Sequence, residues 1–258
     1  VERKLSYKDA AVRKRECLEK GRFTVAIVDF KNASQTQGLD AKISAYMLNA
    51  LITSGDPFLN VVDRDNMQTI LTEQQLQMTG VIDESTAVAV GELVGAKAII
   101  TGTVLSYSEK RGSLRSKQRE GYTAYQDRVL NKTDGKYYMQ TMYRPSSYTE
   151  YYNSENITVS FQYKLTNIKT GEIMATEIVE RTLEDEIIYG RFDGDANALW
   201  PAGQGGPNMN QSDKRALMAM MNGRQELKPF SELSNQLFDT VAKQVGTAVG
   251  DAVKEYVK

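Results

Sequence analysis

The residues with the clearest capacity for chemistry are Asp193, Asp195 and Asn197, whose oxygen side chains recur at alternate positions. This spacing is typical of the start of a calcium-binding loop. Such a loop also needs glycine at its sixth position and glutamate at its twelfth, where this chain has Ala198 and Gln204. The sequence therefore favours a solvated acidic turn, and we predict no metal site.

Histidine, the most common general base and zinc ligand in proteins, is absent from all 258 residues. Its absence excludes the Ser-His-Asp and Cys-His mechanisms. The sequence also shows no glycine-rich phosphate loop and no paired nucleophile and base. We therefore predict that the protein is not an enzyme and binds no cofactor.

The single cysteine cannot form an internal disulfide. Cys17 lies in the charged stretch RKRECLEK, within a segment that we expect to form a helix on the surface of the domain. A free cysteine in a helix usually behaves as a small apolar residue, so we predict that Cys17 is half-buried.

A basic run followed by many tyrosines occupies the middle of the chain. The basic residues are Lys110, Arg111, Arg115, Lys117 and Arg119. The tyrosines are Tyr122, Tyr125, Tyr137, Tyr138, Tyr143, Tyr148, Tyr151 and Tyr152. Such a composition can bind single-stranded nucleic acid through phosphate contacts and stacking. Acidic residues are interspersed, however, and the net charge of the chain is −1, so we predict no nucleic-acid partner.

The apolar periodicity predicts an α/β fold with a mixed β-sheet and helices packed on it. Residues 22–30, 58–62 and 98–104 read as apolar strands, and residues 156–166 and 172–181 read as an antiparallel hairpin. Helices are predicted at 39–51, twice between 63 and 95, at 213–222 and at 231–257. We expect an N-terminal helical segment, residues 1–21, and one domain over 22–258 with a tyrosine-rich, β-hairpin-like insertion at 107–155.

A family resemblance is carried by VVDRDNMQTILTEQQLQMTGVID, which starts at Val61, and by ELVGAKAIITGTV, which ends at Val104. The matching residues are Arg64, Glu73, Gln74, Gly80, Gly95, Ala96, Gly102 and Thr103. The stretches VAIVDFKN and TNIKTGEI fit the same pattern. The chain thereby resembles the CsgG family of curli secretion channel subunits and related bacterial envelope lipoproteins, over residues 22–105 and 156–183.

The resemblance implies a subunit of an oligomeric outer-membrane secretion channel of the CsgG type, which exports protein across the bacterial outer membrane. Its expected partners are further copies of itself in a ring, the outer membrane and a secreted protein cargo. It also implies a location at the periplasmic side of that membrane, with an export and lipidation segment upstream of Val1. The alternative is a periplasmic adaptor lipoprotein that regulates an envelope enzyme or appendage by binding.

In pore-forming members of the resembled family each subunit adds β-hairpins to a shared β-barrel, and the first follows the strand that matches 98–104 here. Residues 107–155 are long enough for two spanning strands. The side chains of Tyr137, Met139, Thr141 and Tyr143 would then form one lipid-facing side. An extension that packs on its own sheet or on a neighbouring subunit explains the same pattern equally well.

The resemblance also suggests residues for the pore and for subunit contacts. In the curli channel a loop after the first strand forms the constriction, and Asn32, Gln35 and Gln37 occupy that place in this chain. The motif residues Arg64 and Glu73 are candidates for an intersubunit contact, although a surface ion pair and a solvated carboxylate are the simpler interpretation.

Overall fold

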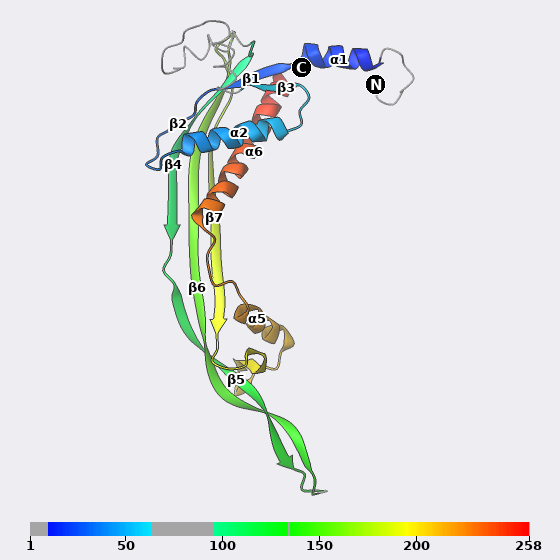
Figure 1. Cartoon of the computed structure of the whole chain (residues 1–258), viewed down its shortest axis with the longest axis vertical. Helices are drawn as coiled ribbons and strands as arrows, with labels where there is room; N and C mark the ends of the chain where they lie inside the picture. The colour runs from blue at the N-terminus through cyan, green and yellow to red at the C-terminus, as the bar shows by residue number, and fades with distance from the viewer. Residues whose placement is uncertain (1–9, 63–94, 134, 258) are drawn as a thin grey trace. The chain divides into compact units, whose positions relative to one another are not determined.

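The computed structural model describes residues 10–62, 95–133 and 135–257 (Figure 1). The helices are α1 (Ala10–Gly21), α2 (Leu39–Thr53), the short 3-10 helix η1 (Ala196–Ala198), α5 (Gln211–Met221) and α6 (Phe230–Val257). The first five strands are β1 (Phe23–Ile27), β2 (Lys31–Asn32), β3 (Leu59–Val62), β4 (Ala98–Arg111) and β5 (Arg115–Leu130). The remaining strands are β6 (Tyr137–Asn167), β7 (Ile173–Arg191), β8 (Leu199–Gly203) and β9 (Gly206–Pro207).

The described strands form a mixed sheet in the order β3-β1-β4-β6-β5-β8-β9, with β2 beside β4 and β7 beside β6. Strand β1 pairs in parallel with β3 and β4, whereas β5 pairs antiparallel with β6 and β8. Together with the helices that pack on it, this sheet confirms the predicted α/β class. The structure does not test whether residues 107–155 are an insertion into the family fold, and that stays a prediction.

The chain divides into two compact units. Unit 1 takes its described residues from 1–108, 157–183 and 230–258, and unit 2 consists of 109–156 and 184–229. Strands β4, β6 and β7 therefore each supply residues to both units. The segment 184–229 belongs to the same unit as the tyrosine-rich residues, and the predicted domain boundaries stay a prediction.

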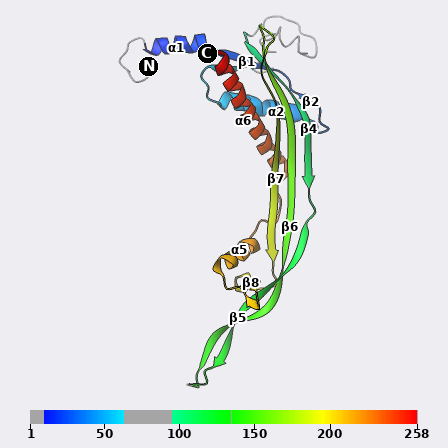
Figure 2. The ribbon, with the colours of Figure 1, turned by 180° about the vertical axis from the view of Figure 1, so that it is seen from behind.

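Unit 1 holds the main hydrophobic core, which α2 and α6 cover on one side of the strands (Figures 1 and 2). Along β6 the core residues alternate with half-exposed ones, so that Ile157, Val159, Phe161, Tyr163 and Leu165 face inward. In α6 the buried positions recur every fourth residue: Leu233, Leu237, Val241, Val245, Val249 and Val253. The helical and strand periodicities therefore meet in one core.

Gly102 of β4 permits close packing against Phe161 of β6 in this core. A Cβ atom at Gly102 of β4 would lie 2.5 Å from the ring of Phe161 on β6, closer than real Cβ atoms approach. The ring of Phe161 also packs edge-on against Phe30, with 5.3 Å between the ring centroids. Glycine at position 102 thus lets the ring of Phe161 pack directly against the backbone of β4.

Several boundaries differ from the sequence-based predictions. Residues 31 and 32 form β2 rather than the start of a loop, because they pair in parallel with Thr103 and Val104. Strand β7 continues to Arg191, ten residues beyond its predicted end at residue 181, through Glu184, Asp185 and Glu186. Its exposed carboxylates conceal the alternation of buried and exposed positions, which is the usual signal of a strand.

The prediction for Cys17 was wrong. The cysteine lies on α1 and is exposed. Helix α1 buries little of its surface among the described residues, since even Val12 is 58% exposed. A helix without a buried face gives a cysteine no apolar environment to enter.

Candidate functional site

The most distinctive feature of unit 2 is the β5–β6 hairpin, which carries most of the tyrosines. Its antiparallel register runs without interruption from Arg115 opposite Tyr152 to Leu130 opposite Tyr137. In the turn, the backbone N–H of Asn131 donates to the carbonyl of Lys136 at 2.8 Å, and Gly135 has a positive φ of 69°. The ladder of backbone hydrogen bonds holds this hairpin together where few side chains are buried.

The middle of the hairpin is anchored by β8 and α5. Residues 121–123 of β5 pair with β8, and a Cβ atom at Gly121 would lie only 2.9 Å from the carbonyl oxygen of Trp200. Trp200 packs edge-on against Tyr143, with 6.1 Å between the rings. The ammonium group of Lys214 lies 4.7 Å from the Trp200 ring, and burial lowers the pKa of this lysine.

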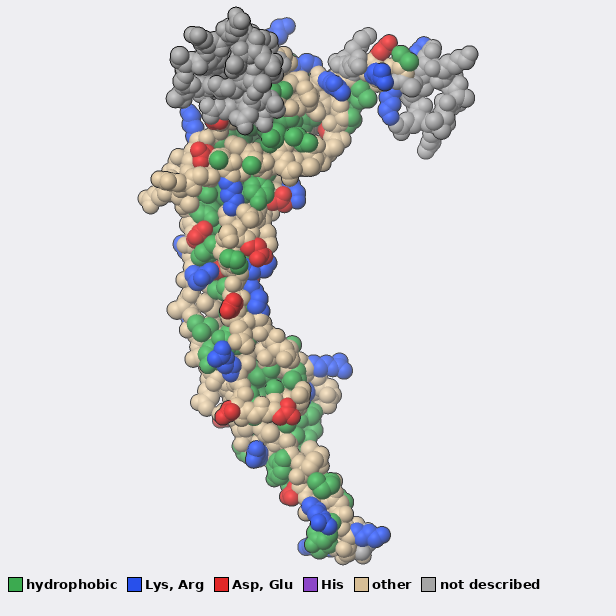
Figure 3. All heavy atoms as spheres, viewed as in Figure 1, with side chains coloured by type: hydrophobic (Ala, Val, Ile, Leu, Met, Phe, Trp, Pro, Cys, Tyr) green, Lys and Arg blue, Asp and Glu red, His purple; other side chains and the backbone are tan. Residues whose placement is uncertain are grey.

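The end of the hairpin that holds the turn, residues 124–143, exposes large apolar side chains, and we call this part the outer hairpin. They are Tyr125, Leu130, Tyr137, Tyr138, Met139 and Met142, with Met139 62% and Tyr137 56% exposed. By the register of the ladder, Leu130, Tyr137 and Met139 share one face, and Tyr125, Tyr138 and Met142 share the other. Figure 3 shows hydrophobic and basic side chains gathered at this end. We call these six residues the apolar tip.

The residues predicted to face lipid have two different environments. Tyr137, Met139 and Thr141 are exposed, and the guanidinium of Arg128 lies 4.3 Å from the centre of the Tyr137 ring. Tyr143 is instead half-buried against Trp200. Tyr137, Met139 and Thr141 are therefore available for contacts with lipid, whereas Tyr143 packs against Trp200. Among the described helices, none has the length and apolar character needed to span a membrane.

The predicted pore-lining residues lie at the end of β2 and in the loop after it. The side chain of Asn32 is occupied locally, because it donates to the carbonyl of Thr36 at 2.7 Å and accepts from the Ser34 N–H at 3.0 Å. Gln35 and Gln37 are exposed. The predicted intersubunit residues Arg64 and Glu73 lie outside the described residues.

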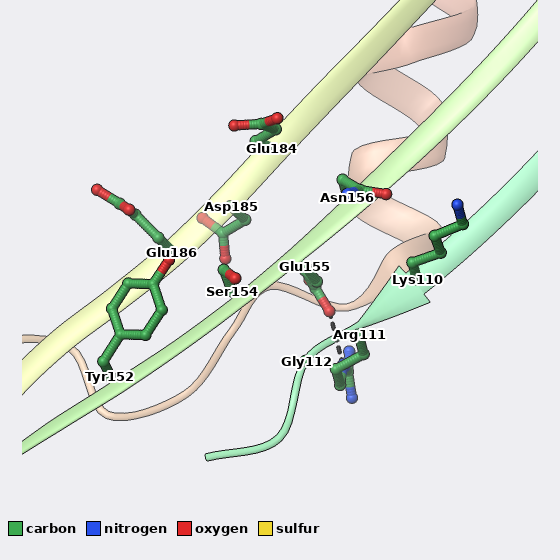
Figure 4. Close-up of a pocket in the computed structure, with 10 residues that line it drawn as sticks. All are labelled: Lys110, Arg111, Gly112, Tyr152, Ser154, Glu155, Asn156, Glu184, Asp185 and Glu186. Carbon is green, nitrogen blue, oxygen red and sulfur yellow. Dashed lines mark hydrogen bonds and ion pairs between the residues drawn. The ribbon is translucent and has the colours of Figure 1, made fainter. Parts of the chain in front are cut away.

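A pocket of about 650 Å³ in unit 2 was not found by sequence reasoning (Figure 4). It is lined by residues 110–112 at the end of β4, by Tyr152, Ser154, Glu155 and Asn156 of β6, and by residues 184–186 of β7. Carboxylates outnumber cations in this lining, and we call it the acidic pocket. Its members are far apart in sequence, so only the strand register brings them together.

Glu155 is the buried member of the acidic pocket, with only 2% of its surface exposed. Its Oε2 accepts a hydrogen bond from Nε of Arg111 at 2.6 Å, which is the dashed line in Figure 4. Its Oε1 has no hydrogen-bond partner in the described part of the chain. A buried carboxylate oxygen without a donor is energetically unfavourable.

Asp185 has its own partners. Its Oδ1 accepts from the guanidinium of Arg224 at 2.6 Å, and its Oδ2 accepts from the backbone N–H of Lys228 at 2.9 Å. The Arg224 hydrogen bond holds the pKa of Asp185 below its ordinary value of 3.8, although burial acts in the opposite direction. Asp185 thus remains ionised at neutral pH and is neutralised by its neighbours.

The acidic segment predicted to be a solvated turn includes η1. The carboxylate of Asp195 accepts from the backbone N–H of Asn197 at 2.9 Å and so caps η1. Within residues 10–62, 95–133 and 135–257, no three acidic or cysteine side chains converge as metal ligands. Asp195 therefore has a structural task in the described segment.

Comparison with solved structures gives distant likenesses. The LpoB C-terminal domain from Salmonella enterica is 11% identical, with a TM-score of 0.37 over 62% of this chain and 82% of that one. The PelC dodecamer from Paraburkholderia phytofirmans is 12% identical, with a TM-score of 0.35 over 86% of each chain. Lipoprotein GNA1162 from Neisseria meningitidis is 12% identical, with a TM-score of 0.33 over 76% of this chain and 93% of that one.

No curated protein matches the chain at the level of sequence. A family model does match, however, and it covers residues 3–188, which is well over half of the chain. That model describes the curli production assembly/transport component CsgG. The matched range includes the parallel strands β1, β3 and β4, the β5–β6 hairpin and most of β7. On this match, the chain belongs to the CsgG family.

Proposed function

We propose that the protein is a subunit of a homo-oligomeric ring at the bacterial outer membrane that exports protein, and that the apolar tip is the element that enters the lipid. Membership of the CsgG family supports the transport part of this proposal. The observation that carries the membrane part is the exposure of six large apolar side chains at one end of a single hairpin. Exposed apolar patches of this kind commonly mark membrane or protein contacts.

The dimensions and composition of the outer hairpin suit this function. Residues 122–130 and 137–145 are paired, and a tilted transmembrane strand needs about 9 to 11 residues. Tyrosine is favoured where a ring is buried in lipid and its hydroxyl is wet. Strand β8 pairs with β5 at residues 121–123, so the described edge of β5 beyond Thr123 is open to a strand from another copy.

An in-register deletion tests the proposal. Removing residues 124–143 and joining Thr123 to Arg144 through Asn-Gly keeps the ladder, because these two residues are already opposite each other. We expect the parent protein to float with liposomes and to form closed rings with a detergent belt in electron micrographs. The shortened protein should fold but no longer float. A shortened protein that floats like the parent would contradict the proposal.

A matched control separates the loss of strand from the loss of apolar surface. Replacing all six residues of the apolar tip by threonine keeps β-propensity and hairpin length. This variant should also fail to float. Replacing the exposed Leu105, Ile173 and Ile178 of unit 1 by threonine should leave flotation unchanged. If the apolar-tip variant and the unit 1 variant lost flotation equally, the parent would bind liposomes through nonspecific apolar contacts rather than through the hairpin.

A second function is favoured by the charges within the outer hairpin. Arg128 shares a face with Met139, and Asp127 and Arg144 share the opposite face with Tyr138, so neither face is continuously apolar. Such a surface also suits a periplasmic adaptor that binds an envelope enzyme or appendage. Soluble monomers without detergent, together with no flotation of the parent, would favour this adaptor over the ring.

The pore and subunit residues form part of the ring proposal. We propose that Gln35 and Gln37, together with Asn32, line the opening. Cysteine at position 35 or 37, in a Cys17→Ser background because Cys17 is exposed, should allow a bulky thiol reagent to block single-channel current.

We also propose that Arg64 and Glu73 contribute to the contact between subunits. Substitution of either residue should then prevent ring assembly without changing the melting temperature. Assembly as in the parent would exclude this contact.

A further inference from the structure

We propose that the turn end of the β5–β6 hairpin binds the phosphate groups of anionic lipids. Three exposed side chains, Arg128, Lys132 and Lys136, form this site, and we call them the basic turn. The assignment rests on the proposed function, because it names the class of lipid that the outer hairpin meets. The local charge, the position of Arg128 on a tyrosine ring and the neighbouring apolar side chains support it.

The basic turn is opposite in charge to the chain as a whole. Residues 128–137 contain three basic residues and one acidic residue, Asp134, so their net charge is +2, whereas that of the whole chain is −1. Figure 3 shows basic side chains gathered beside hydrophobic ones at this end. The adjacent acid, Asp127, accepts a hydrogen bond from the backbone N–H of Arg128 at 2.8 Å. This local excess of positive charge favours an anionic membrane surface over a neutral one.

The basic run at residues 110–119 differs from the basic turn, because its charge is partly balanced within the protein. Nε of Arg111 donates to Glu155 at 2.6 Å. Arg119 donates to both carboxylate oxygens of Glu150, at 2.9 and 3.2 Å. Two of the five cations in this run therefore already pair with carboxylates of β6. The more prominent basic segment of the sequence thus has less charge to offer to a ligand.

Arg128 is well placed to bind phosphate. Its guanidinium lies over the ring of Tyr137, 4.3 Å from the ring centre. Tyr137 is opposite Leu130, two residues closer to the turn than Arg128, so the Arg128 side chain extends toward the turn. A guanidinium that lies over a ring keeps its N–H donors at its edge, where two of them match two oxygens of a phosphate. Tyrosine is itself favoured at the level of lipid headgroups.

The apolar tip continues from the basic turn toward the rest of unit 2. Met139 is opposite Arg128, and Met142 is opposite Tyr125, three ladder positions further from the turn. Each position advances about 3.3 Å, so these side chains cover about 10 Å of the hairpin. Long basic side chains can keep their charge among headgroups while their stems contact apolar surface. A hairpin that crosses the membrane from its unit 2 end thus brings the basic turn to the headgroups of the far leaflet.

Flotation of the full chain with two kinds of vesicle tests the lipid class. The vesicles contain phosphatidylcholine alone, or phosphatidylcholine with one third phosphatidylglycerol. We expect at least about tenfold tighter binding to the anionic vesicles, because each basic residue at such a surface contributes about fivefold. High salt should remove this preference by screening. Equal binding to both vesicles would overturn the anionic-lipid assignment but keep membrane insertion, whereas no binding to either would overturn the proposed function as well.

A charge-removing variant tests the residues of the basic turn. Arg128→Gln/Lys132→Gln/Lys136→Gln should bind anionic vesicles no more tightly than neutral ones, while its binding to neutral vesicles stays as in the parent. Its melting temperature should not change, because all three side chains are exposed. A variant that keeps the parent's preference for anionic vesicles would contradict the proposal.

A matched control removes the same charge elsewhere in unit 2. Arg115→Gln/Lys117→Gln/Arg215→Gln changes three exposed basic side chains outside the basic turn. This variant should retain the preference for anionic vesicles. If both triple variants lost the preference equally, the overall charge of the unit would be responsible, and the assignment to the basic turn would fail.

Inorganic phosphate distinguishes a lipid surface from a soluble anion. At matched ionic strength, phosphate should release the protein from anionic vesicles no more than chloride does, because a free phosphate makes no contact with the apolar tip. Clearly stronger release by phosphate would indicate a site for a soluble anion and overturn the lipid assignment.

Discussion

The two units of the molecule differ in how much apolar side-chain surface they bury. In unit 1 the described strands and helices bury a continuous set of apolar side chains, including Phe161 and Phe238 with no exposed surface. Unit 2 has few such residues, namely Ile187, Tyr189, Leu199 and Leu217, and exposes the six of the apolar tip. Unit 2 is therefore held by strand ladders, stacked rings and charge pairs, while unit 1 is held by its core.

This difference indicates where function resides. A region that exposes apolar side chains and keeps a carboxylate oxygen unpaired loses stability that a purely structural region would keep. Such features persist when a partner compensates for them. Unit 1 has the character of a scaffold, and unit 2 carries the exposed apolar side chains. Substitutions in unit 1 should therefore mainly lower stability, and substitutions at the apolar tip of unit 2 should mainly change binding.

The largest loss of stability is expected from Phe161→Ala in unit 1. The ring is fully buried, packs against Phe30 and covers Gly102, so its removal leaves a cavity. We expect the free energy of unfolding to fall by about 3 to 5 kcal/mol in chemical denaturation. The matched truncation in unit 2, Tyr138→Ala, removes an exposed ring and should cost less than about 0.5 kcal/mol. Equal costs would show that the outer hairpin is packed in solution.

The next effect concerns the Arg111–Glu155 pair. Arg111→Met leaves the carboxylate of Glu155 buried without its donor, and because Arg111 is half-exposed we expect a cost of about 1 to 3 kcal/mol. Glu155→Gln removes the charge itself and should cost less or even stabilise the protein. The double variant should therefore be more stable than Arg111→Met alone, and a double-mutant cycle measures this coupling. Additive losses would mean that the pair is not coupled.

A smaller effect depends on pH. Because the folded pKa of Asp185 is below 3.8, its carboxylate stabilises the fold at neutral pH. That contribution is complete above about pH 4 to 5 and is lost as the pH falls below 3.8 through the folded pKa. Asp185→Asn should cost about 1 to 2 kcal/mol at pH 7 and less in acid. Urea unfolding at pH 7 and pH 3 checks this, with Asp193→Asn, which changes an exposed carboxylate of unit 2, as the control.

The sequence predicted unit 1 far better than unit 2. Period-two alternation marks Ile157 to Leu165, and spacing by three and four marks α6, because one face of each element is buried. In unit 2, β5 buries few residues, and in β7 the carboxylates at 184–186 hide the alternation of buried and exposed positions, so β7 was predicted to end ten residues early. The Arg111–Glu155 pair could not be predicted, since the two residues meet only through strand pairing that has no local signal.

The smallest change in stability should accompany one of the clearest changes in function, at the exposed end of the hairpin. Tyr137→Ser and Met139→Ser act on side chains that are mostly exposed, so each should alter the free energy of unfolding by no more than about 0.5 kcal/mol. If these side chains enter lipid, burying them in the membrane gives about 1.5 to 3 kcal/mol for a side chain of this size. The double variant should then lose most of its flotation with liposomes while its melting temperature stays unchanged. Thr141→Ser, on the same face of the same strand, removes only a methyl group and serves as the control. Flotation that survives in the double variant would mean that the hairpin meets a protein or solvent rather than lipid, and the comparison between a buried scaffold and a membrane-seeking hairpin would fail.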